Sequence, residues 1–218
     1  DLSHGYRQAD TAYHSGRLAQ QGDFAGVRDY HEGDELKRVH WKTTARTQKL
    51  TVVENEDATT GQTTIVLDQS YGSDFGTGMI TSFDVATGAA AYAVREYLRK
   101  TKKARLVIAQ DSTVNTLELR DMKDLSMALT ALAEAQAESS ISGPELLRNC
   151  ERCENIIFIT TQPSKQLAAA AAHAVSRGVG LSIAIVDPQP FGKSIEIGPL
   201  VTELKHAGAV VELIREVR

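Results

Sequence analysis

The sequence predicts an α/β protein built on a doubly wound, mostly parallel sheet with a short N-terminal extension. Three observations lead to this expectation. Short apolar runs recur along the chain after Gly61. Helical stretches with apolar stripes separate most of these runs, and that alternation is typical of a sheet covered by helices on both faces. Several of the helical stretches also carry a proline near their start and a glycine after their end.

The expected strands are apolar runs rich in β-branched residues and bounded by turn-forming residues. Thr113–Leu119 alternates polar and apolar residues and is therefore expected at an edge of the sheet, whereas Asn155–Thr161 is expected to be buried. The six runs are Thr63–Asp68, Ala104–Ala109, Thr113–Leu119, Asn155–Thr161, Val179–Asp187 and Ala209–Ile214.

Helices are expected between these runs. Ser82–Lys100 is apolar around much of its circumference, which is typical of a helix packed on a sheet. Pro163 is expected to open an alanine-rich helix that Gly178 closes, and Pro199–Gly208 repeats that pattern. Helical spacing predicts one shared apolar face for Met122, Leu125, Leu129 and Leu132.

The first sixty residues differ from the rest of the chain. Residues 1–22 are polar without clear periodicity, which favours an extended or partly disordered lead-in. Asp34, which follows Gly33, is placed to cap a short helix, and Leu50–Glu56 is expected to form a strand. The turn-forming segment at 58–61 divides the chain into an N-terminal extension, residues 1–60, and an α/β domain, residues 61–218.

The composition limits the class of protein. Hydrophobic residues make up 42% and charged residues 24%, as in soluble globular domains, and the net charge is −4. No apolar run approaches the roughly 18 residues of a membrane span, and nothing resembles a signal peptide. The chain begins with Asp1 and is expected to be part of a longer protein. Any membrane anchor of that protein is expected outside this segment.

Two basic clusters stand out against this acidic balance. Lys37–Lys49 holds five cations and no acid, and Arg95–Arg105 holds six cations against Glu96 alone. Such clusters bind nucleic acid, anionic lipid or an acidic partner, or they form a solvated surface, and the sequence leaves these alternatives open. His40 and Trp41 in the first cluster would allow base stacking, but the four acids just before it would repel a phosphate backbone.

The two cysteines, Cys150 and Cys153, form a C-x-x-C pair. Such a pair is half of a zinc site, and no second cysteine pair completes it. A redox C-x-x-C usually follows a strand and opens a helix, whereas this pair precedes an expected strand. The sequence therefore predicts two structural, reduced cysteines.

The ends of the expected strands are where ligands bind in open α/β sheets. The first strand of the domain ends at Asp68, and Ser70 follows two residues later. Carboxylate and hydroxyl oxygens suit Mg²⁺. A Mg²⁺-dependent phosphohydrolase that uses Asp68 is a less favoured alternative, because Ser70 occupies the position of the second acid expected in a phosphoaspartate enzyme. No strand end carries a glycine-rich phosphate-binding motif or a G-x-S-x-G motif.

The same region resembles known families. The segment from Asp68 to Gly72 resembles the start of the D-x-S-x-S motif in the metal-ion-dependent adhesion site of von Willebrand factor A domains. The upstream signature residues, followed by the strand that ends at Asp68, resemble the bacterial family known as domain of unknown function fifty-eight. The resemblance covers roughly residues 22–161 well and the remainder in the order of its elements. The signature residues are Arg28, Tyr30, Gly33, Asp34, Arg38, His40, Trp41 and Arg46.

The resemblance implies a von Willebrand factor A-like, Rossmann-type domain with a non-enzymatic adaptor role. Members of the family are often anchored in the membrane by a short N-terminal hydrophobic hairpin. They are typically associated with MoxR-type AAA+ ATPases and sometimes with transglutaminase-like membrane proteins. The implied location is the cytoplasmic face of the bacterial plasma membrane. The resemblance establishes no enzymatic activity.

The adhesion-site pattern is incomplete in this sequence. Gly72 stands at the last serine position of the motif, and Thr160 and Thr161 stand where the pattern has an acid. A partner's carboxylate would then complete the shell of a bound Mg²⁺. The ligands that the resemblance implies are Asp68, Ser70 and Ser140, with Ser142 as an alternative to Ser140.

Three roles remain open for the signature segment, residues 28–46. It is scaffolding anchored by Tyr30 and Trp41, a docking surface for a protein partner, or a nucleic-acid grip that uses the first basic cluster. The adaptor role combines the first two. The alternative function is a nucleic-acid or anionic-surface binder that uses residues 37–49 and 95–105.

Overall fold

The computed structural model describes residues 24–29, 51–55, 62–101, 103–150 and 152–215. The contacts divide the chain into two compact units. The smaller unit contains two paired strands, and the larger unit contains the sheet and helices that follow Gly61.

The smaller unit contains β1 (Phe24–Asp29) and β2 (Thr51–Asn55), which pair antiparallel with Arg28 opposite Val52. The strand β2 confirms the expectation for Leu50–Glu56. The strand β1 was not expected. The predicted lead-in over residues 1–22 and the predicted helix after Asp34 lie outside the described residues.

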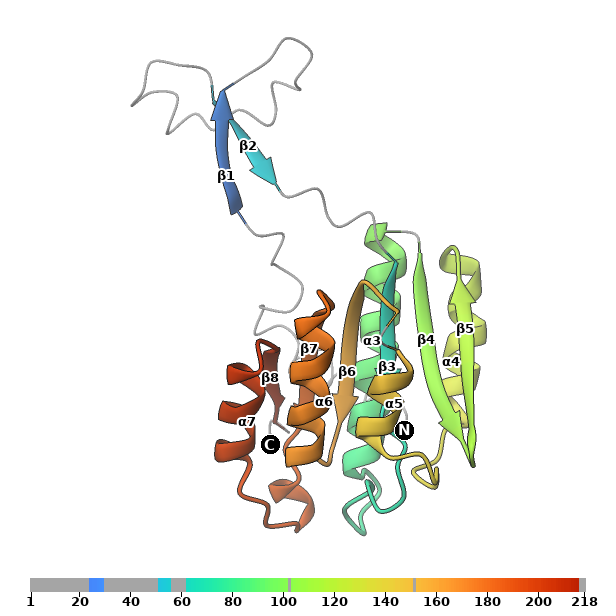
Figure 1. The fold of residues 1–218 in the computed structure, drawn as a ribbon. Helices are drawn as coiled ribbons and strands as arrows, with labels where there is room; N and C mark the ends of the chain where they lie inside the picture. Colours follow the sequence, from blue (N-terminus) through green and yellow to red (C-terminus); the bar gives the residue numbers. More distant parts are fainter. Residues whose placement is uncertain (1–23, 30–50, 56–61, 102, 151, 216–218) are drawn as a thin grey trace. The chain divides into compact units, whose positions relative to one another are not determined.

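The larger unit contains a six-stranded sheet with the order β5-β4-β3-β6-β7-β8 (Figure 1). All neighbouring strands in it are parallel except the pair β4–β5, which places the antiparallel strand at an edge as predicted. The strands are β3 (Thr63–Leu67), β4 (Ala104–Gln110), β5 (Thr113–Leu119), β6 (Asn155–Thr160), β7 (Gly180–Val186) and β8 (Val210–Ile214).

The strand order contains a topological switch point between β3 and β6. From β3 the chain proceeds outward through β4 and β5, and it then returns to the other side of β3 and proceeds through β6, β7 and β8. Crossovers that leave a switch point in opposite directions open a crevice beyond the carboxyl ends of the two central strands. The residues after β3 and β6 therefore face the place where α/β proteins bind their ligands.

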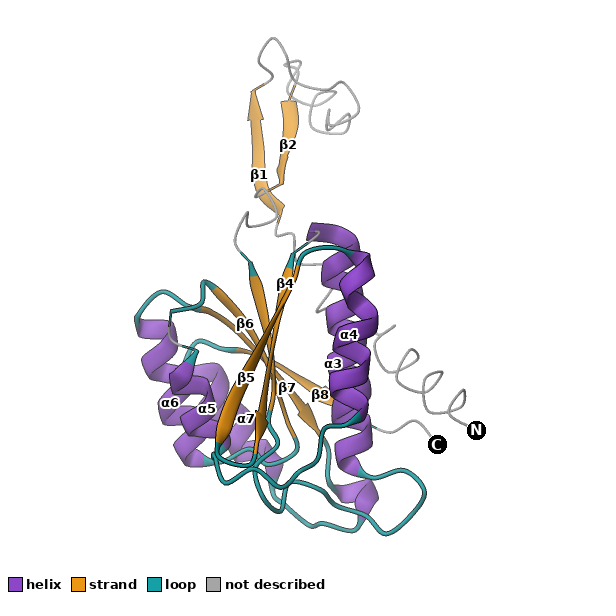
Figure 2. Ribbon diagram, turned by 90° about the vertical axis from the view of Figure 1, so that its right-hand side faces the viewer, coloured by secondary structure: helices purple, strands orange, loops and turns teal. Residues whose placement is uncertain are grey.

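Helices cover both faces of the sheet (Figure 2). On one face lie α3 (Ser82–Thr101) and α4 (Leu125–Ala133). On the other face lie α5 (Gly143–Asn149), α6 (Lys165–Ser176) and α7 (Ile197–His206). Short 3₁₀ turns η2 (Met122–Asp124) and η3 (Gln189–Phe191) complete the connections. This arrangement is the doubly wound, Rossmann-like α/β fold that the sequence predicts.

The core lies on both sides of the central strands. Every residue of β3 is buried, and Phe158 of β6 is fully enclosed. Alanines on α3 and α6 allow these helices to approach the sheet closely, and removing such apolar surface from water is the main stabilising term. Gly178, which ends α6 as predicted, adopts φ +88°, a left-handed conformation that glycine accepts without steric cost.

Two details differ from the sequence expectations. Met122 is 47% exposed in η2 and does not share the buried face of α4, which runs through Ala128 and Leu132. The Asp121 side chain accepts a hydrogen bond from the Lys123 backbone N–H, so a separate 3₁₀ turn forms before the helix begins. In addition, the prolines do not open their helices: Pro163 precedes α6, and α7 begins before Pro199.

Among the residues that the structure describes, no helix combines the length and apolar character needed to cross a bilayer.

Candidate functional site

The candidate site lies at the switch point, where Asp68 follows β3 and Thr160 ends β6. The Asp68 backbone N–H donates to the Ile159 carbonyl at 2.9 Å, which extends the pairing of the two strands by one residue. The Asp68 side chain is buried, with only 2% of the residue exposed. Its Oδ1 accepts a hydrogen bond from the Ser70 backbone N–H at 3.1 Å, and its Oδ2 accepts one from the Thr160 hydroxyl at 2.8 Å.

Burial raises the pKa of the Asp68 carboxyl group above its ordinary value. Hydrogen bonds from Ser70 and Thr160 lower the pKa but do not outweigh the loss of water. Both of these partners are neutral, so they stabilise the carboxylate less than a nearby cation would. The site is therefore short of positive charge when Asp68 is ionised.

A second loop, residues 139–143, packs against the loop after β3. Ser70 and Ser139 form an isolated parallel bridge, and the Tyr71 backbone N–H donates to the Ser139 carbonyl at 2.9 Å. Gly143 at the start of α5 lies directly against Asp68, because a Cβ at this position would be 2.4 Å from Asp68 Oδ2. Only glycine fits this close approach without displacement of the carboxyl group.

Ser140 lies in this second loop, and its hydroxyl donates to the backbone carbonyl of Asp111 at 3.2 Å. The Ser139 hydroxyl donates to the same carbonyl at 2.9 Å. Of the three ligands expected for Mg²⁺, the structure brings Asp68 and Ser70 together, whereas the hydroxyl of Ser140 bonds to Asp111. Ser142, the alternative, is the N-cap residue of α5 and makes no side-chain capping hydrogen bond.

The threonines that stand where an acid was expected have structural partners. Thr160 donates to Asp68 and accepts a hydrogen bond from the Gln162 backbone N–H at 2.9 Å. The Thr161 hydroxyl donates to the carbonyl of Ser73, and the Gln162 side-chain amide donates to the carbonyl of Gly72. These contacts tie the end of β6 to the loop after β3. In the sequence, Thr160 stands only at the position of a missing acid, and its bond to Asp68 was not expected.

The donor set around Asp68 is one carboxylate with hydroxyls nearby. These are hard oxygen ligands of the kind that Mg²⁺ prefers, and Mg²⁺ in proteins is often bound by one or two carboxylates and several waters. No cluster of three or more His, Cys, Asp or Glu side chains suitable for a metal occurs among the described residues. The residues present therefore fit a cation only when water or a partner's carboxylate supplies the remaining ligands.

The loop between β3 and α3 exposes large apolar side chains. Tyr71 is 81% exposed, Met79 95% and Ile80 36%. The loop is nevertheless held in place, because the Ser82 hydroxyl accepts a hydrogen bond from the Phe75 backbone N–H at 2.8 Å. Apolar side chains that an anchored loop presents to solvent are a feature of interaction sites.

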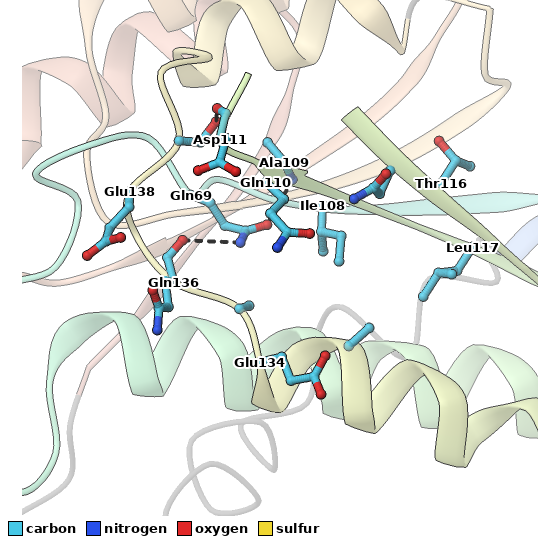
Figure 3. A pocket seen from close by; sticks show the side chains of 14 residues that line it. Gln69, Ile108, Ala109, Gln110, Asp111, Thr116, Leu117, Glu134, Gln136 and Glu138 are labelled. Carbon is cyan, nitrogen blue, oxygen red and sulfur yellow. Dashed lines mark hydrogen bonds between the residues drawn. The ribbon is translucent and has the colours of Figure 1, made fainter. Parts of the chain in front are cut away.

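A separate cavity of about 370 Å³ lies between the β4–β5 edge and the end of α4 (Figure 3). The Gln69 side chain forms part of its wall, because its Oε1 accepts from the Ala109 backbone N–H at 2.9 Å and its Nε2 donates to the Gln136 carbonyl at 3.2 Å. Glu134 and Glu138 also line the cavity. The cavity is thus polar and acidic, and the hydrogen-bonding groups of Gln69 are already paired.

The three arginines of the second basic cluster are paired with acids of the same surface. Arg99 lies 2.7 Å from Glu96, and Arg105 lies 2.6 Å from Glu118. Arg95 lies 3.7 Å from Glu96 and also stacks over the Tyr92 ring, with 5.1 Å to its centroid. These pairs reduce the positive charge that the cluster offers to a phosphate backbone. The first cluster, residues 37–49, lies outside the described residues, and its role stays a prediction.

The signature residues also lie outside the described ranges except for Arg28, whose backbone belongs to β1. The others are Tyr30, Gly33, Asp34, Arg38, His40, Trp41 and Arg46.

Comparison with known proteins relates these features to a family. The comparison with curated proteins found no match. The sequence model of the family described as protein of unknown function DUF58 matches residues 26–191. This range includes most of β1, the Asp68 region and the strands through β7. Because the match spans well over half of the chain, this protein belongs to the DUF58 family.

Proposed function

We propose that this chain is a non-enzymatic protein-interaction module, an adaptor, that binds a partner protein at the carboxyl edge of its sheet. One observation carries the proposal: the anchored loop that exposes Tyr71 and Met79 starts at Asp68, at the switch point of the fold. Exposed aromatic and methionine side chains are common at protein interfaces, and the switch point is where α/β folds place their binding sites.

The surroundings of Asp68 favour binding over catalysis. A nucleophile or general base must reach the substrate atom on which it acts. Both oxygens of Asp68 accept hydrogen bonds within the protein, and the side chain is almost fully enclosed. The raised pKa also favours the protonated, less nucleophilic form. These features argue against a phosphohydrolase that uses Asp68.

A divalent cation is part of the proposal. Mg²⁺ bound by Ser70 and by the lone pairs of Asp68 that the internal hydrogen bonds leave unused would neutralise the charge that burial leaves uncompensated, and a carboxylate of the partner would complete its shell. Ser140 would join this shell only after its hydroxyl leaves the Asp111 carbonyl. Such a site makes metal binding and partner binding depend on each other.

The proposed partner is a MoxR-type AAA+ ATPase, and the family resemblance described above supports this choice. We place the domain at the cytoplasmic face of the bacterial plasma membrane, as the soluble portion of a membrane-anchored protein. The same resemblance supports that location.

The test is the affinity of the full protein for a purified MoxR-type ATPase, measured by calorimetry. Met79→Asp places a charge in the proposed interface and is expected to weaken binding at least tenfold, since contacts at interface centres often contribute more than about 1.4 kcal/mol. Met127→Asp on α4 is the matched control, because Met127 is also an exposed methionine but lies on a helix over one face of the sheet. Equal losses for both variants would place the interface elsewhere.

The metal is tested through Asp68→Asn rather than by chelation, because the ATPase itself uses Mg²⁺ with its nucleotide. The Asp68→Asn variant is expected to bind the ATPase more weakly than the wild type. If both residues act on one surface, adding Met79→Asp to this variant should cause no further loss of affinity. Full affinity in Asp68→Asn would remove the metal from the proposal. The absence of any binding by the wild type would reject the ATPase as the partner.

A further inference from the structure

The amino-terminal ends of the strands, here called the amino edge of the sheet, hold a second group of reactive side chains. This group lies at the opposite end of the strands from Asp68. Cys150 follows α5, and Cys153 lies two residues before β6. Both cysteines are free, with Cys150 buried and Cys153 partly exposed. The Cys153 backbone N–H donates to the Cys150 carbonyl at 2.9 Å. A turn closed in this way brings its first and fourth Cα atoms within about 7 Å, near the range that a disulfide bridges.

A guanidinium group contacts the more exposed sulfur. Arg105 of β4 directs Nη1 toward Cys153 Sγ at 3.6 Å, while its Nε lies 2.6 Å from Glu118 Oε1. The contact joins residues 48 positions apart in the sequence, so it is a feature of the fold. A cation beside a thiol stabilises the thiolate, which is the nucleophilic form of cysteine.

A buried hydroxyl supports the same charge state. Thr64 of β3 is fully buried, and its Oγ1 has no hydrogen-bond partner other than the Cys153 sulfur among the described residues. Leaving a buried hydroxyl unpaired costs free energy, and a thiolate at Cys153 provides the acceptor that is missing. The Cys150 thiol, Thr64 and Arg105 together lower the pKa of Cys153 to about 5, although burial opposes the shift. The pKa of Cys150 is raised, chiefly by its hydrogen bond to Cys153.

We propose that Cys150 and Cys153 form a reactive dithiol that a peroxide oxidises to an intramolecular disulfide. This role differs from the inert, structural one that the sequence predicts for the pair. The proposal does not rest on the adaptor function, because none of the residues involved belongs to the Asp68 site.

The two thiols have different tasks in this reaction. The Cys153 thiolate attacks one oxygen of hydrogen peroxide, the O–O bond breaks, and the departing hydroxide takes a proton from the solvent to become water. Cys153 is then a sulfenic acid. The Cys150 sulfur loses its proton and attacks the Cys153 sulfur, and the sulfenic hydroxyl leaves with that proton as a second water. Two electrons pass from the dithiol to the peroxide, which yields two waters and one disulfide.

The first experiment measures the rate of iodoacetamide alkylation of Cys153 in the native full chain between pH 6 and pH 8 by mass spectrometry. An ordinary thiol with a pKa of about 8.5 becomes roughly 80-fold more ionised over this interval, and its rate rises accordingly. Cys153 is expected to react at a rate that changes less than about twofold, because it is already ionised at pH 6. An increase near 80-fold would overturn the proposal.

Two arginine variants test the origin of this behaviour. Arg105→Gln removes the cation beside Cys153 and is expected to make the alkylation rate rise with pH. Arg99→Gln is the matched control, since Arg99 pairs with Glu96 on α3 and is expected to leave the rate flat. Equal profiles for the two variants would exclude Arg105 from the site. Glu118→Gln removes the competing acid while it keeps Arg105, and it is expected to retain the flat profile even where Arg105→Gln folds poorly.

The second experiment treats the reduced protein with one equivalent of hydrogen peroxide. The wild type is expected to lose both free thiols and the mass of two hydrogens, and dithiothreitol is expected to restore both. Cys150→Ser should stop at the Cys153 sulfenic acid, which dimedone traps, and Cys153→Ser should be unreactive. Peroxide treatment that leaves both wild-type thiols titratable would overturn the proposal, as would equal oxidation of Cys153→Ser.

Discussion

Asp68 and Cys153 are two acidic groups at opposite ends of the strands of one sheet. Their environments shift their pKa values in opposite directions. Asp68 is enclosed by neutral donors, so burial dominates and its pKa rises. Cys153 is also desolvated, yet the Cys150 thiol, Thr64 and the Arg105 guanidinium outweigh that effect and lower its pKa to about 5. The difference teaches that burial alone does not set the charge of a group. The charge of a buried group depends on whether nearby hydrogen-bond donors outweigh its desolvation. At Cys153 they do, and one of these donors is a cation.

The largest effect is expected from Gly143→Ala, which tests how tightly Asp68 is enclosed. A Cβ there would lie 2.4 Å from Asp68 Oδ2, so overpacking should lower the free energy of unfolding by about 1–3 kcal/mol. Gly198→Ala is the matched control, because Gly198 also precedes a proline at the start of a helix but has open space around its Cα. It is expected to lower the free energy of unfolding by less than Gly143→Ala does, because both alanines would precede a proline and only the one at position 143 would meet Asp68. Urea unfolding measures both, and a loss in Gly198→Ala equal to that in Gly143→Ala would contradict the enclosure.

The next largest effect is expected from Mg²⁺ binding at the Asp68 site. A cation that binds only the folded state raises the free energy of unfolding by about 1.4 kcal/mol at a tenfold excess over its dissociation constant. We expect millimolar Mg²⁺ to raise the melting temperature of the wild type relative to EDTA and to have no effect on Asp68→Asn. Equal responses of the two proteins would mean that the metal binds away from Asp68.

The pH dependence of stability should show the contrast between the two acids directly. The folded pKa of Asp68 is raised, so the stability that its proton contributes is present below the unfolded pKa and is lost as pH rises through the folded value. The folded pKa of Cys153 is lowered, so its contribution is present above the unfolded pKa near 9 and is lost as pH falls through about 5.

The measurement for this prediction is urea unfolding in EDTA and a reducing agent at several pH values. The free energy of unfolding of the wild type minus that of Asp68→Asn should fall as pH rises. The same difference taken with Cys153→Ser should rise between pH 5 and pH 9. Slopes of the same sign would refute the contrast.

The smallest effect is expected at the Arg105–Glu118 ion pair. Its side chains are partly exposed, and exposed pairs contribute about 0.2–1 kcal/mol. Glu118→Gln should therefore change the free energy of unfolding by less than about 1 kcal/mol while the alkylation of Cys153 stays fast. A decrease of several kcal/mol in the free energy of unfolding would show that the ion pair stabilises the structure around the amino ends of the strands.

Much of the fold could be predicted from the sequence because its signals are local. Apolar runs predicted the strands from β3 to β8, and helical spacing together with proline and glycine signals predicted α3, α4, α6 and α7. The strand β1 was missed because Gly26, Arg28 and Asp29 disrupt any strand pattern in it, and its partner β2 lies more than twenty residues away. The exposure of Met122 depends on a cap at Asp121 that periodicity does not reveal.

The candidate site could be predicted only in part for the same reason. The strand-end rule identified Asp68 and Ser70 from their positions alone. The bond from Thr160 to Asp68 joins residues 92 positions apart, and the contact of Gly143 with Asp68 also joins distant segments. No local pattern encodes such contacts. Arg105 and Cys153 meet across the sheet in the same way.

The short helix α5 runs from the carboxyl ends of the strands, where Asp68 lies, to their amino ends, where the two cysteines lie. Its first residue, Gly143, packs against Asp68, and the residue that caps its other end, Cys150, belongs to the dithiol. Seven helical residues span only about 10 Å, and the backbone hydrogen bonds of the helix join its two ends. A displacement of Cys150 by disulfide formation would therefore push or pull the glycine against the Asp68 carboxyl group. Oxidation of the two cysteines and binding of a partner at the Asp68 site would then be coupled through two turns of helix.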